Sequence, residues 1–236
     1  MNVRILVADA SHTGYAERIC DLMAISAKER GTGIAKRSPE YIAEKMRTNK
    51  AIIALSDDTD DPLVGFSYIE SWSHCQFVAN SGLIVNHKYR QLGLGEKIKN
   101  SIFHLSRERY PNAKIFAITT GAAVMKINSR LGYRPVPFSE LTQDTEFWKG
   151  CEGCRNYDIL QRNDRRMCLC TGMLYDPNEH PNRKTKSANV TVRIKTAEAN
   201  SQPQTTATPA IAATAPAASA ASATTLPTMA PAITQA

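Results

Sequence analysis

The chain has 236 residues and a formal net charge of +7, with a sequence pI of about 9.1. That length suffices for one domain with a sizeable core, or for two small domains. The segment from Pro177 onward carries five basic and two acidic residues, a net +3 that leaves +4 on the first 176 residues. This small excess suits a phosphorylated small molecule, and no basic stripe indicates a nucleic-acid partner.

We expect a cytoplasmic protein without a membrane partner. Met1 leads directly into a strand-like pattern with no basic and apolar leader, and no apolar run approaches the length of a membrane span. The six cysteines are then thiols in a reducing cytoplasm. The sequence leaves open whether the chain forms a homodimer.

Short strands alternate with amphipathic helices over most of the chain. Apolar runs predict the strands, a 3.6-residue period predicts the helices, and Ser38 followed by Pro39 is typical of a helix start. The unit from 75 to 120 should cross over right-handedly, so that its two strands are parallel. In chain order we expect a strand at 3–9, helices at 15–30 and 38–46, strands at 51–56, 62–71 and 75–86, a helix from 95 to about 110, a strand at 113–120, a helix at 122–133, and strands at 155–160 and 167–175.

The end of the chain has a different composition. From about residue 200 onward, alanine, threonine, proline and serine dominate and no residue is charged. Such a segment buries too little apolar surface to offset the entropy lost on ordering. We therefore expect one domain over residues 1–175 and a disordered tail, a soluble tether, over residues 176–236.

The stretch NHKYRQLGLGEKIKNSI places Arg90, Gly93 and Gly95 in the order R-x-x-G-x-G, between a strand pattern and a helix pattern. The first turn of a helix presents unpaired N–H groups and the positive end of the helix dipole, which together favour phosphate. The glycines let the backbone approach the ligand, and Arg90, Lys97 and Lys99 would add charge. Alone this is a weak signal, and the turn lacks the lysine and hydroxyl residue of a nucleotide P-loop.

The order of elements, with R-x-x-G-x-G after the fourth strand, resembles the GNAT superfamily of acyl-CoA N-acyltransferases over about residues 1–175. The later INSRLGY resembles the Y-x-x-x-G-F helix end of that family. The resemblance implies a mixed α/β fold with a twisted, mostly antiparallel sheet and flanking helices, in which the fourth and fifth strands are parallel and splayed. It also implies an acyl donor, acetyl-CoA or succinyl-CoA.

The resemblance further implies which residues bind the donor. Backbone amides of the glycine turn would hold the diphosphate, and the preceding strand would hydrogen-bond the pantetheine in the wedge between the splayed strands. A backbone N–H of that strand would stabilise the oxyanion formed at the thioester carbonyl. The donor-binding candidates are Leu83, Ile84, Val85, Arg90, Gln91, Leu92, Gly93, Leu94, Gly95, Glu96 and Asn128.

Asn128 departs from the family pattern. It stands where the family often carries a tyrosine that protonates the leaving thiolate, and Gly121 stands where an asparagine is usual. An amide is no general acid, so the proton must come from water or another group. Because a thiolate is a tolerable leaving group, turnover is still expected.

Glu70 and Ser81 are the catalytic candidates. An acceptor amine must lose a proton before it attacks, and Glu70, at the end of the third expected strand, is the carboxylate nearest the expected centre. Ser81 and His74 are alternatives that would act through an ordered water. Glu70 is equally well explained as a solvated edge residue, and His74 is better explained as a turn residue.

Positive charge is concentrated between the first two helices, in AKERGTGIAKRSPEY, which in the GNAT family usually lies over the acceptor site. Arg30, Lys36 and Arg37 would suit an acceptor that carries carboxylates, although a solvated helix end is the commoner role of such charge. IFAITTGAAVMKINSRLGY resembles domains that acylate glutamate, and FWKGCEGCRNYDIL resembles small bacterial GNAT proteins associated with arginine biosynthesis. The resemblance favours L-glutamate as the acceptor of an acetyl or succinyl group.

Four cysteines are spaced like metal ligands, as Cys151-x-x-Cys154 and Cys168-x-Cys170. If residues 155–160 and 167–175 form a hairpin, however, the two pairs lie roughly 10 Å apart along it. Buried free thiols are the expected state, and zinc is the alternative.

Two other functions fit the same sequence. One is a GNAT enzyme that acylates a protein or another amine, although the positive acceptor segment has the wrong sign for a cationic amine. The other is a non-catalytic module that binds CoA or zinc. Release of free thiol from acyl-CoA in the presence of single amino acids distinguishes the three.

Overall fold

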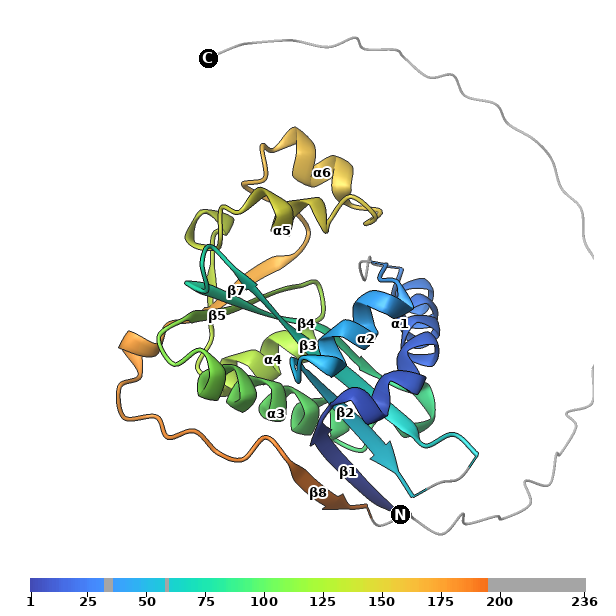
Figure 1. Ribbon diagram of the computed structural model, residues 1–236. Coiled ribbons are helices and arrows are strands. Elements are labelled where there is room, and N and C mark those ends of the chain that lie inside the picture. Colours follow the sequence, from blue (N-terminus) through green and yellow to red (C-terminus); the bar gives the residue numbers. More distant parts are fainter. Residues whose placement is uncertain (32–35, 58–59, 195–236) are drawn as a thin grey trace, which may run out of the picture. The chain divides into compact units, whose positions relative to one another are not determined.

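The structure is a computed structural model that describes residues 1–31, 36–57 and 60–194, without the side chain of Arg30. One sheet runs through the described residues in the order β6-β7-β5-β4-β3-β2-β1-β8 (Figure 1). Neighbouring strands are antiparallel except β4 and β5, which are parallel. The strands are β1 (Asn2–Val7), β2 (Ala51–Ser56), β3 (Leu63–Trp72), β4 (Phe77–Val85), β5 (Lys114–Thr119), β6 (Arg134–Val136), β7 (Thr171–Tyr175) and β8 (Val190–Arg193).

Helices cover both faces of this sheet. The α-helices are α1 (Ala16–Arg30), α2 (Pro39–Arg47), α3 (Leu94–Arg109), α4 (Ala122–Arg130), α5 (Thr145–Lys149) and α6 (Tyr157–Arg162). Short 3₁₀ helices are η1 (Ala10–Tyr15), η2 (His87–Tyr89), η3 (Phe138–Glu140) and η4 (Pro177–Glu179). The mixed α/β fold expected from the sequence, with its parallel β4–β5 pair, is confirmed.

The strand side chains explain this layering. In β2, Ile52 and Ala54 pack with the apolar side of α3, whereas Ile53 and Leu55 pack with α1 and α2 on the other face. A strand buried on both faces reads as a continuous apolar run because successive side chains point to opposite faces. On the same face as α1 and α2, but over the β5–β7 half, Trp148 of α5 and Leu160 of α6 pack on Phe116. Two separate pairs of helices, α1 with α2 and α5 with α6, therefore pack on that face.

The parallel seam between β4 and β5 is short. Three residue pairs join the strands, and the last pairs Ala79 with Phe116. Beyond this pair the two strands separate into a wedge. The other edge of β4 has a register shift against β3, and Gly82 lies within that irregular part with φ +63°. A Cβ at Gly82 would lie 2.3 Å from the Tyr68 ring, so both backbone conformation and space require glycine there.

The expected hairpin of residues 155–160 and 167–175 is wrong. The first segment is the N-terminal part of α6 and the loop before it, and the second becomes a strand only from Thr171 onward. Tyr157 and Leu160, three residues apart, pack in the same apolar cluster as Trp148 of α5. This spacing is helical, but the segment is too short for its sequence to show a helical period. The sequence did not predict α5, β6 or β8.

The sheet extends beyond the expected domain boundary at residue 175. Residues 190–193 form β8, which pairs with β1, and Asn189 Oδ1 accepts a 2.7 Å hydrogen bond from the Val7 backbone N–H. Residues 176–194 thus differ from the expected disordered tail, and residues 195–236 lie outside the described residues. None of the described helices combines the length and apolar character that crossing a membrane requires.

Candidate active site

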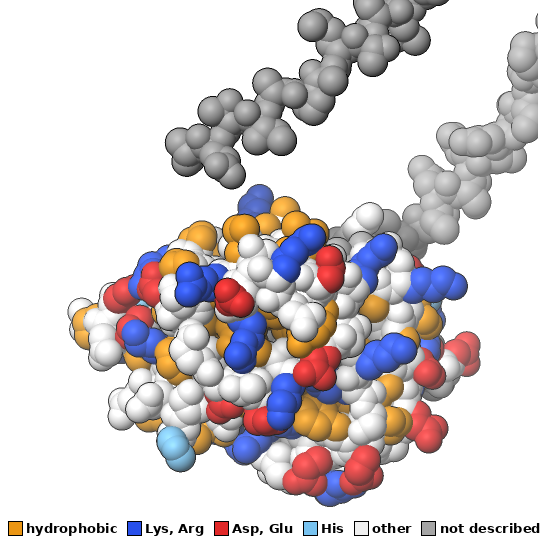
Figure 2. All heavy atoms as spheres, turned by 90° about the horizontal axis from the view of Figure 1, so that it is seen from above, with side chains coloured by type: hydrophobic (Ala, Val, Ile, Leu, Met, Phe, Trp, Pro, Cys, Tyr) orange, Lys and Arg blue, Asp and Glu red, His pale blue; other side chains and the backbone are white. Residues whose placement is uncertain are grey.

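A cavity of about 520 Å³ opens where β4 and β5 separate. Residues 79–83 of β4 and 116–119 of β5 line it, together with side chains from α1, α2, β3 and α5. That volume is typical of small-molecule sites. Figure 2 views the molecule from the side of α6, and on this face basic side chains lie among acidic ones without forming one patch.

The glycine turn precedes α3 as expected. Gly93 is the N-cap residue of α3 with φ +71°, and Gln91 also has a positive φ of 65°. No side chain caps this helix end, so the N–H groups of its first turn keep their capacity to bind an anion. A Cβ at Gly93 would meet no atom within 4 Å, so backbone conformation alone favours glycine there.

Arg90 and Glu96, two charged residues around this turn, pair with other side chains. Arg90 lies 2.7 Å from Glu29 Oε2 of α1, and its Nε donates to the Val85 carbonyl. Glu96 receives two hydrogen bonds from Arg130, at 3.0 and 2.9 Å, which tie α3 to α4. The side chain of Leu92 is exposed, whereas that of Leu94 is buried in the core. Lys97, in the first turn of α3, has an exposed side chain, so an anion bound here could contact it as well as the backbone amides.

The expected pantetheine strand forms the C-terminal half of β4. Leu83 lines the cavity, Ile84 is buried against the α1–α2 face, and Val85 packs on the opposite face. Gly65 of β3 approaches Ile84 closely, since a Cβ at Gly65 would lie 2.5 Å from the Ile84 carbonyl oxygen. This half of β4 is thus held by β3 on one side and faces the wedge on the other.

Glu70 is the centre of a hydrogen-bond network in the cavity. Its carboxylate accepts hydrogen bonds from the Tyr41 hydroxyl and, at 2.6 Å, from Ser81 Oγ. Glu70 pairs with Ala79 in the β3–β4 ladder, so Ser81, two residues further along β4, lies diagonal to it on the same face. The structure therefore brings the two catalytic candidates together. Glu70 is only 6% exposed, so it is not a solvated edge residue.

Arg37 completes this network. Its guanidinium lies 3.6 Å from Glu70 and donates from Nε to the Tyr68 hydroxyl at 3.0 Å. Burial, and next the charge of Glu70, raise the pKa of both Tyr41 and Tyr68. Both phenols therefore stay protonated, and Tyr41 remains a hydrogen-bond donor to Glu70. Lys36 also lines the cavity with an exposed side chain, whereas the side chain of Arg30 lies outside the described residues.

Comparison with solved structures identifies this architecture. A GNAT-family acetyltransferase from Staphylococcus aureus Mu50 matches with a TM-score of 0.52 and 14% identity, covering 74% of this chain and 99% of that chain. This chain has the GNAT fold.

Two other GNAT-fold neighbours were solved with CoA. The N-acetylglutamate synthase of Neisseria gonorrhoeae, in complex with coenzyme A and N-acetyl-glutamate, has a TM-score of 0.53 and 19% identity, and the match covers 74% of this chain. This chain spans about a third of that synthase, 35% of its length. Rv2747 of Mycobacterium tuberculosis, in complex with CoA, has a TM-score of 0.53 and 15% identity, covering 73% of this chain and 98% of that chain. Neither a family model nor a curated protein matches the sequence.

Two residues of this GNAT fold lie elsewhere than the sequence suggested. Asn128 is fully buried, its amide donates to Met173 Sδ at 3.6 Å, and it does not line the cavity. Its Oδ1 is buried without a hydrogen-bond partner in the described part of the chain. Lys99, which we expected beside the anion, instead lines the cavity from α3, where its Nζ donates to Asn80 Oδ1 of β4.

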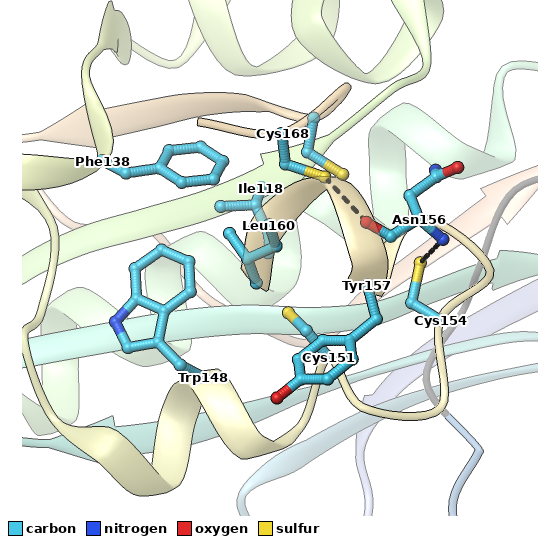
Figure 3. Close-up of a pocket in the computed structure, with 10 residues that line it drawn as sticks. Ile118, Phe138, Trp148, Cys151, Cys154, Asn156, Tyr157, Leu160 and Cys168 are labelled. Atoms are coloured by element: carbon cyan, nitrogen blue, oxygen red, sulfur yellow. Dashed lines mark hydrogen bonds between the residues drawn. The ribbon is translucent and has the colours of Figure 1, made fainter. Parts of the chain in front are cut away.

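The four spaced cysteines line a second, small cavity of about 20 Å³ (Figure 3). The 10 Å separation expected between the two pairs does not hold, because the hairpin behind it does not form. Burial, and next the neighbouring thiols, raise the pKa of Cys151 to about 11 and of Cys170 to about 12. Among residues 1–31, 36–57 and 60–194, no group of three or more histidine, cysteine or acidic side chains is arranged to hold a metal ion. The residues as placed do not fit zinc.

Sequence reasoning missed several cavity residues of this GNAT fold. Tyr41 lies in α2, and the sequence analysis did not anticipate that its hydroxyl reaches Glu70. Tyr68 precedes Glu70 by two residues on β3, so strand alternation alone would have placed both on one face. Trp72 and Phe147 also line the cavity, in an edge-to-face contact at 5.7 Å between ring centroids.

Proposed function

We propose that this chain is an acyl-CoA-dependent N-acyltransferase that moves an acetyl or succinyl group to the α-amine of a small acidic amino acid, L-glutamate first. The observation that carries the proposal is the buried Glu70 carboxylate beside a wedge between two parallel strands. The wedge offers a slot for an extended donor, and Glu70 offers a proton acceptor at its inner end.

On this proposal the donor binds along α3 and β4. The amides of residues 91–96 hold the diphosphate at the uncapped start of α3. The free edge of residues 83–85 hydrogen-bonds the pantetheine as a neighbouring strand would. A backbone N–H of β4 points at the thioester carbonyl and stabilises the negative charge that forms there.

Glu70 is the general base of this reaction. It takes the proton of the acceptor amine, directly or through a water held by Ser81, and the amine then attacks the thioester carbon. The hydroxyls of Tyr41 and Ser81 fix the orientation of the carboxylate. These side chains come from three elements, so the position of Glu70 depends on the whole fold.

Charge supports an acidic acceptor. Arg37 donates from Nε to the Tyr68 hydroxyl and from Nη1 to the Lys36 carbonyl, and its Nη2 lies 3.6 Å from Glu70. A guanidinium has five N–H groups, so Arg37 keeps others for an acceptor carboxylate. Lys36 adds a second positive charge on the same rim. The neighbouring synthase, named for N-acetylglutamate, supports glutamate as the acceptor.

Free-thiol release tests this function. The full chain is incubated with acetyl-CoA or succinyl-CoA and single amino acids, and we expect L-glutamate to stimulate release more than L-glutamine, which has the same shape without the side-chain charge. No release with glutamate removes this acceptor. Release only with a peptide N-terminus, lysine or a polyamine favours a different acceptor, and CoA binding without release for any amine favours a non-catalytic module.

A further inference from the structure

Lys99 is a buried lysine at the base of the wedge. It lies in the second turn of α3, its side chain is 1% exposed, and it is among the residues that line the large cavity. Exposed lysines need no explanation, but a fully buried one is rare unless a carboxylate pairs with it. Within the described residues, the Lys99 ammonium has no ion pair.

Neutral groups hold Lys99 in place. Its Nζ donates to Asn80 Oδ1 at 3.2 Å and lies 5.1 Å from the centroid of the Tyr133 ring. The Tyr133 hydroxyl donates to the same oxygen at 3.0 Å, while the Asn80 amide donates to Ser106 Oγ at 2.7 Å. Asn80 is therefore fixed with its oxygen toward the lysine. Burial lowers the pKa of Lys99 to about 7, so both protonation states are accessible near neutral pH.

Asn80 locates Lys99 relative to the wedge. It is the first β4 residue beyond the last β4–β5 pair, so Lys99 reaches the point where the two strands part. The next residue, Ser81, contacts Glu70. Because successive strand side chains point to opposite faces, Lys99 and Glu70 approach one short piece of β4 from opposite sides.

We propose that the Lys99 ammonium protonates the sulfur of CoA as the thioester breaks. This inference rests on the proposed function, and it supplies the proton donor that Asn128 cannot be. Glu70 first takes a proton from the acceptor ammonium, and the neutral amine then forms the new C–N bond and releases its second proton to water. The C–S bond then breaks with its electron pair on sulfur, which takes a proton from Lys99 Nζ. Solvent later returns a proton to Lys99 and takes one from Glu70.

Binding of free CoA to the unmodified protein tests the contact without turnover. An adjacent ammonium favours the thiolate, so we expect the thiol pKa of bound CoA to be about 1–3 units lower than that of free CoA, measured by thiolate absorbance. Desulfo-CoA is the blank for this titration. An unchanged or raised thiol pKa overturns the inference, and failure of CoA to bind overturns the proposed function as well.

Lys99→Met then tests the proton transfer. Methionine fills the same volume without a proton, so we expect kcat to fall about 100-fold, the lower end for general acid catalysis because a thiolate leaves readily. The kcat/KM of the unmodified enzyme should decline as pH rises through about 7, and this decline should vanish in Lys99→Met. Lys184→Met, at an exposed lysine, is the matched control. Unchanged kcat and pH profile in Lys99→Met, with acyl transfer intact, would refute the role of Lys99 and leave the proposed function standing.

Discussion

The orientation of the Glu70 carboxylate depends on side chains that lie far apart in the sequence. Tyr41 belongs to α2, Ser81 to β4, and Arg37 to the segment before α2. The two hydroxyls each donate to a different carboxylate oxygen, so the carboxylate has a fixed plane. A glutamine cannot accept from both hydroxyls with the same geometry, because one of its two terminal atoms is a donor.

On the proposed function, Glu70→Gln should therefore lose most acyl transfer. Removal of a general base lowers rates by about 100- to 10,000-fold, and we expect a loss in kcat of that size with CoA affinity unchanged. Glu44→Gln, which changes an exposed glutamate of α2 that pairs with Arg47, is the control and should match the unmodified protein. Steady-state kinetics with calorimetric measurement of CoA binding would decide, and a full kcat in Glu70→Gln would contradict a base at this position.

Lys99 should also make stability depend on pH. The unfolded chain keeps the lysine proton up to about pH 10.4, whereas the folded chain releases it above about pH 7 because burial lowers the pKa. Between these values the unfolded state binds more protons. The free energy of unfolding of the unmodified protein should therefore rise with pH relative to that of Lys99→Met. Thermal melts from pH 6 to 10 measure the difference. A constant gap between the two melting temperatures would show that Lys99 titrates normally.

At the scale of single elements, the irregular centre of β4 shapes the wedge. Gly82 has a positive φ and lies against the Tyr68 ring, next to Ser81 and Leu83 of the cavity wall. A register shift increases the local twist of a strand, so this irregularity helps to turn β4 away from β5.

Gly82→Ala should be destabilising. The left-handed conformation alone costs a non-glycine residue about 1–3 kcal/mol, and the new methyl group would also overlap the Tyr68 ring. Gly14→Ala is the matched control, because a Cβ there meets no atom within 4 Å and φ is not positive, so we expect a change within about 0.5 kcal/mol. Urea denaturation measures both. Equal stability of the two variants would contradict the close approach of Tyr68.

Cys151, in the α5–α6 connection, and Cys170, just before β7, should react slowly. The pKa values of Cys151 and Cys170 are raised to about 11 and about 12, so few of these thiols are ionised at pH 8, whereas Cys75 is exposed. We expect mass spectrometry to find Cys75 alkylated first and the other two only after unfolding. Protection that disappears on adding a chelator would instead indicate a bound metal.

For the molecule as a whole, β8 closes one edge of the sheet. It pairs with β1 through four residue pairs, and Val192 and Ile194 pack on the main core. An uncovered β1 would present unpaired backbone groups at a sheet edge.

Truncations should therefore separate β8 from the residues that follow it. A chain that ends at residue 194 should have the same melting temperature as the full chain. A chain that ends at residue 189 loses β8, and its free energy of unfolding should be about 1–3 kcal/mol lower. Each kcal/mol should lower the melting temperature by roughly 2–4 °C. Scanning calorimetry of the three proteins measures this. Equal melting of the two truncated chains would show that β8 contributes nothing to stability.

Much of this fold followed from local patterns. Apolar runs and helix starts located most strands and helices between residues 2 and 133 because each pattern reports on its own burial. Segment 155–160 was misassigned because six residues do not distinguish a strand from a helix. Glu70 and Ser81 could be predicted from their positions on the strands. Lys99 and Tyr133, by contrast, lie 19 and 53 positions from Asn80 in the sequence. No local sequence pattern predicts that these three side chains are in contact.

Only three residue pairs join β4 to β5, so the sheet consists of two weakly connected parts. One part has the five strands from β8 to β4, and the other has the three strands from β5 to β6. A ligand that lies in the slot beside the seam bridges those halves with hydrogen bonds that the protein does not make for itself. Occupancy by the proposed donor should consequently slow amide hydrogen exchange in strands on both sides, including strands that never touch the ligand.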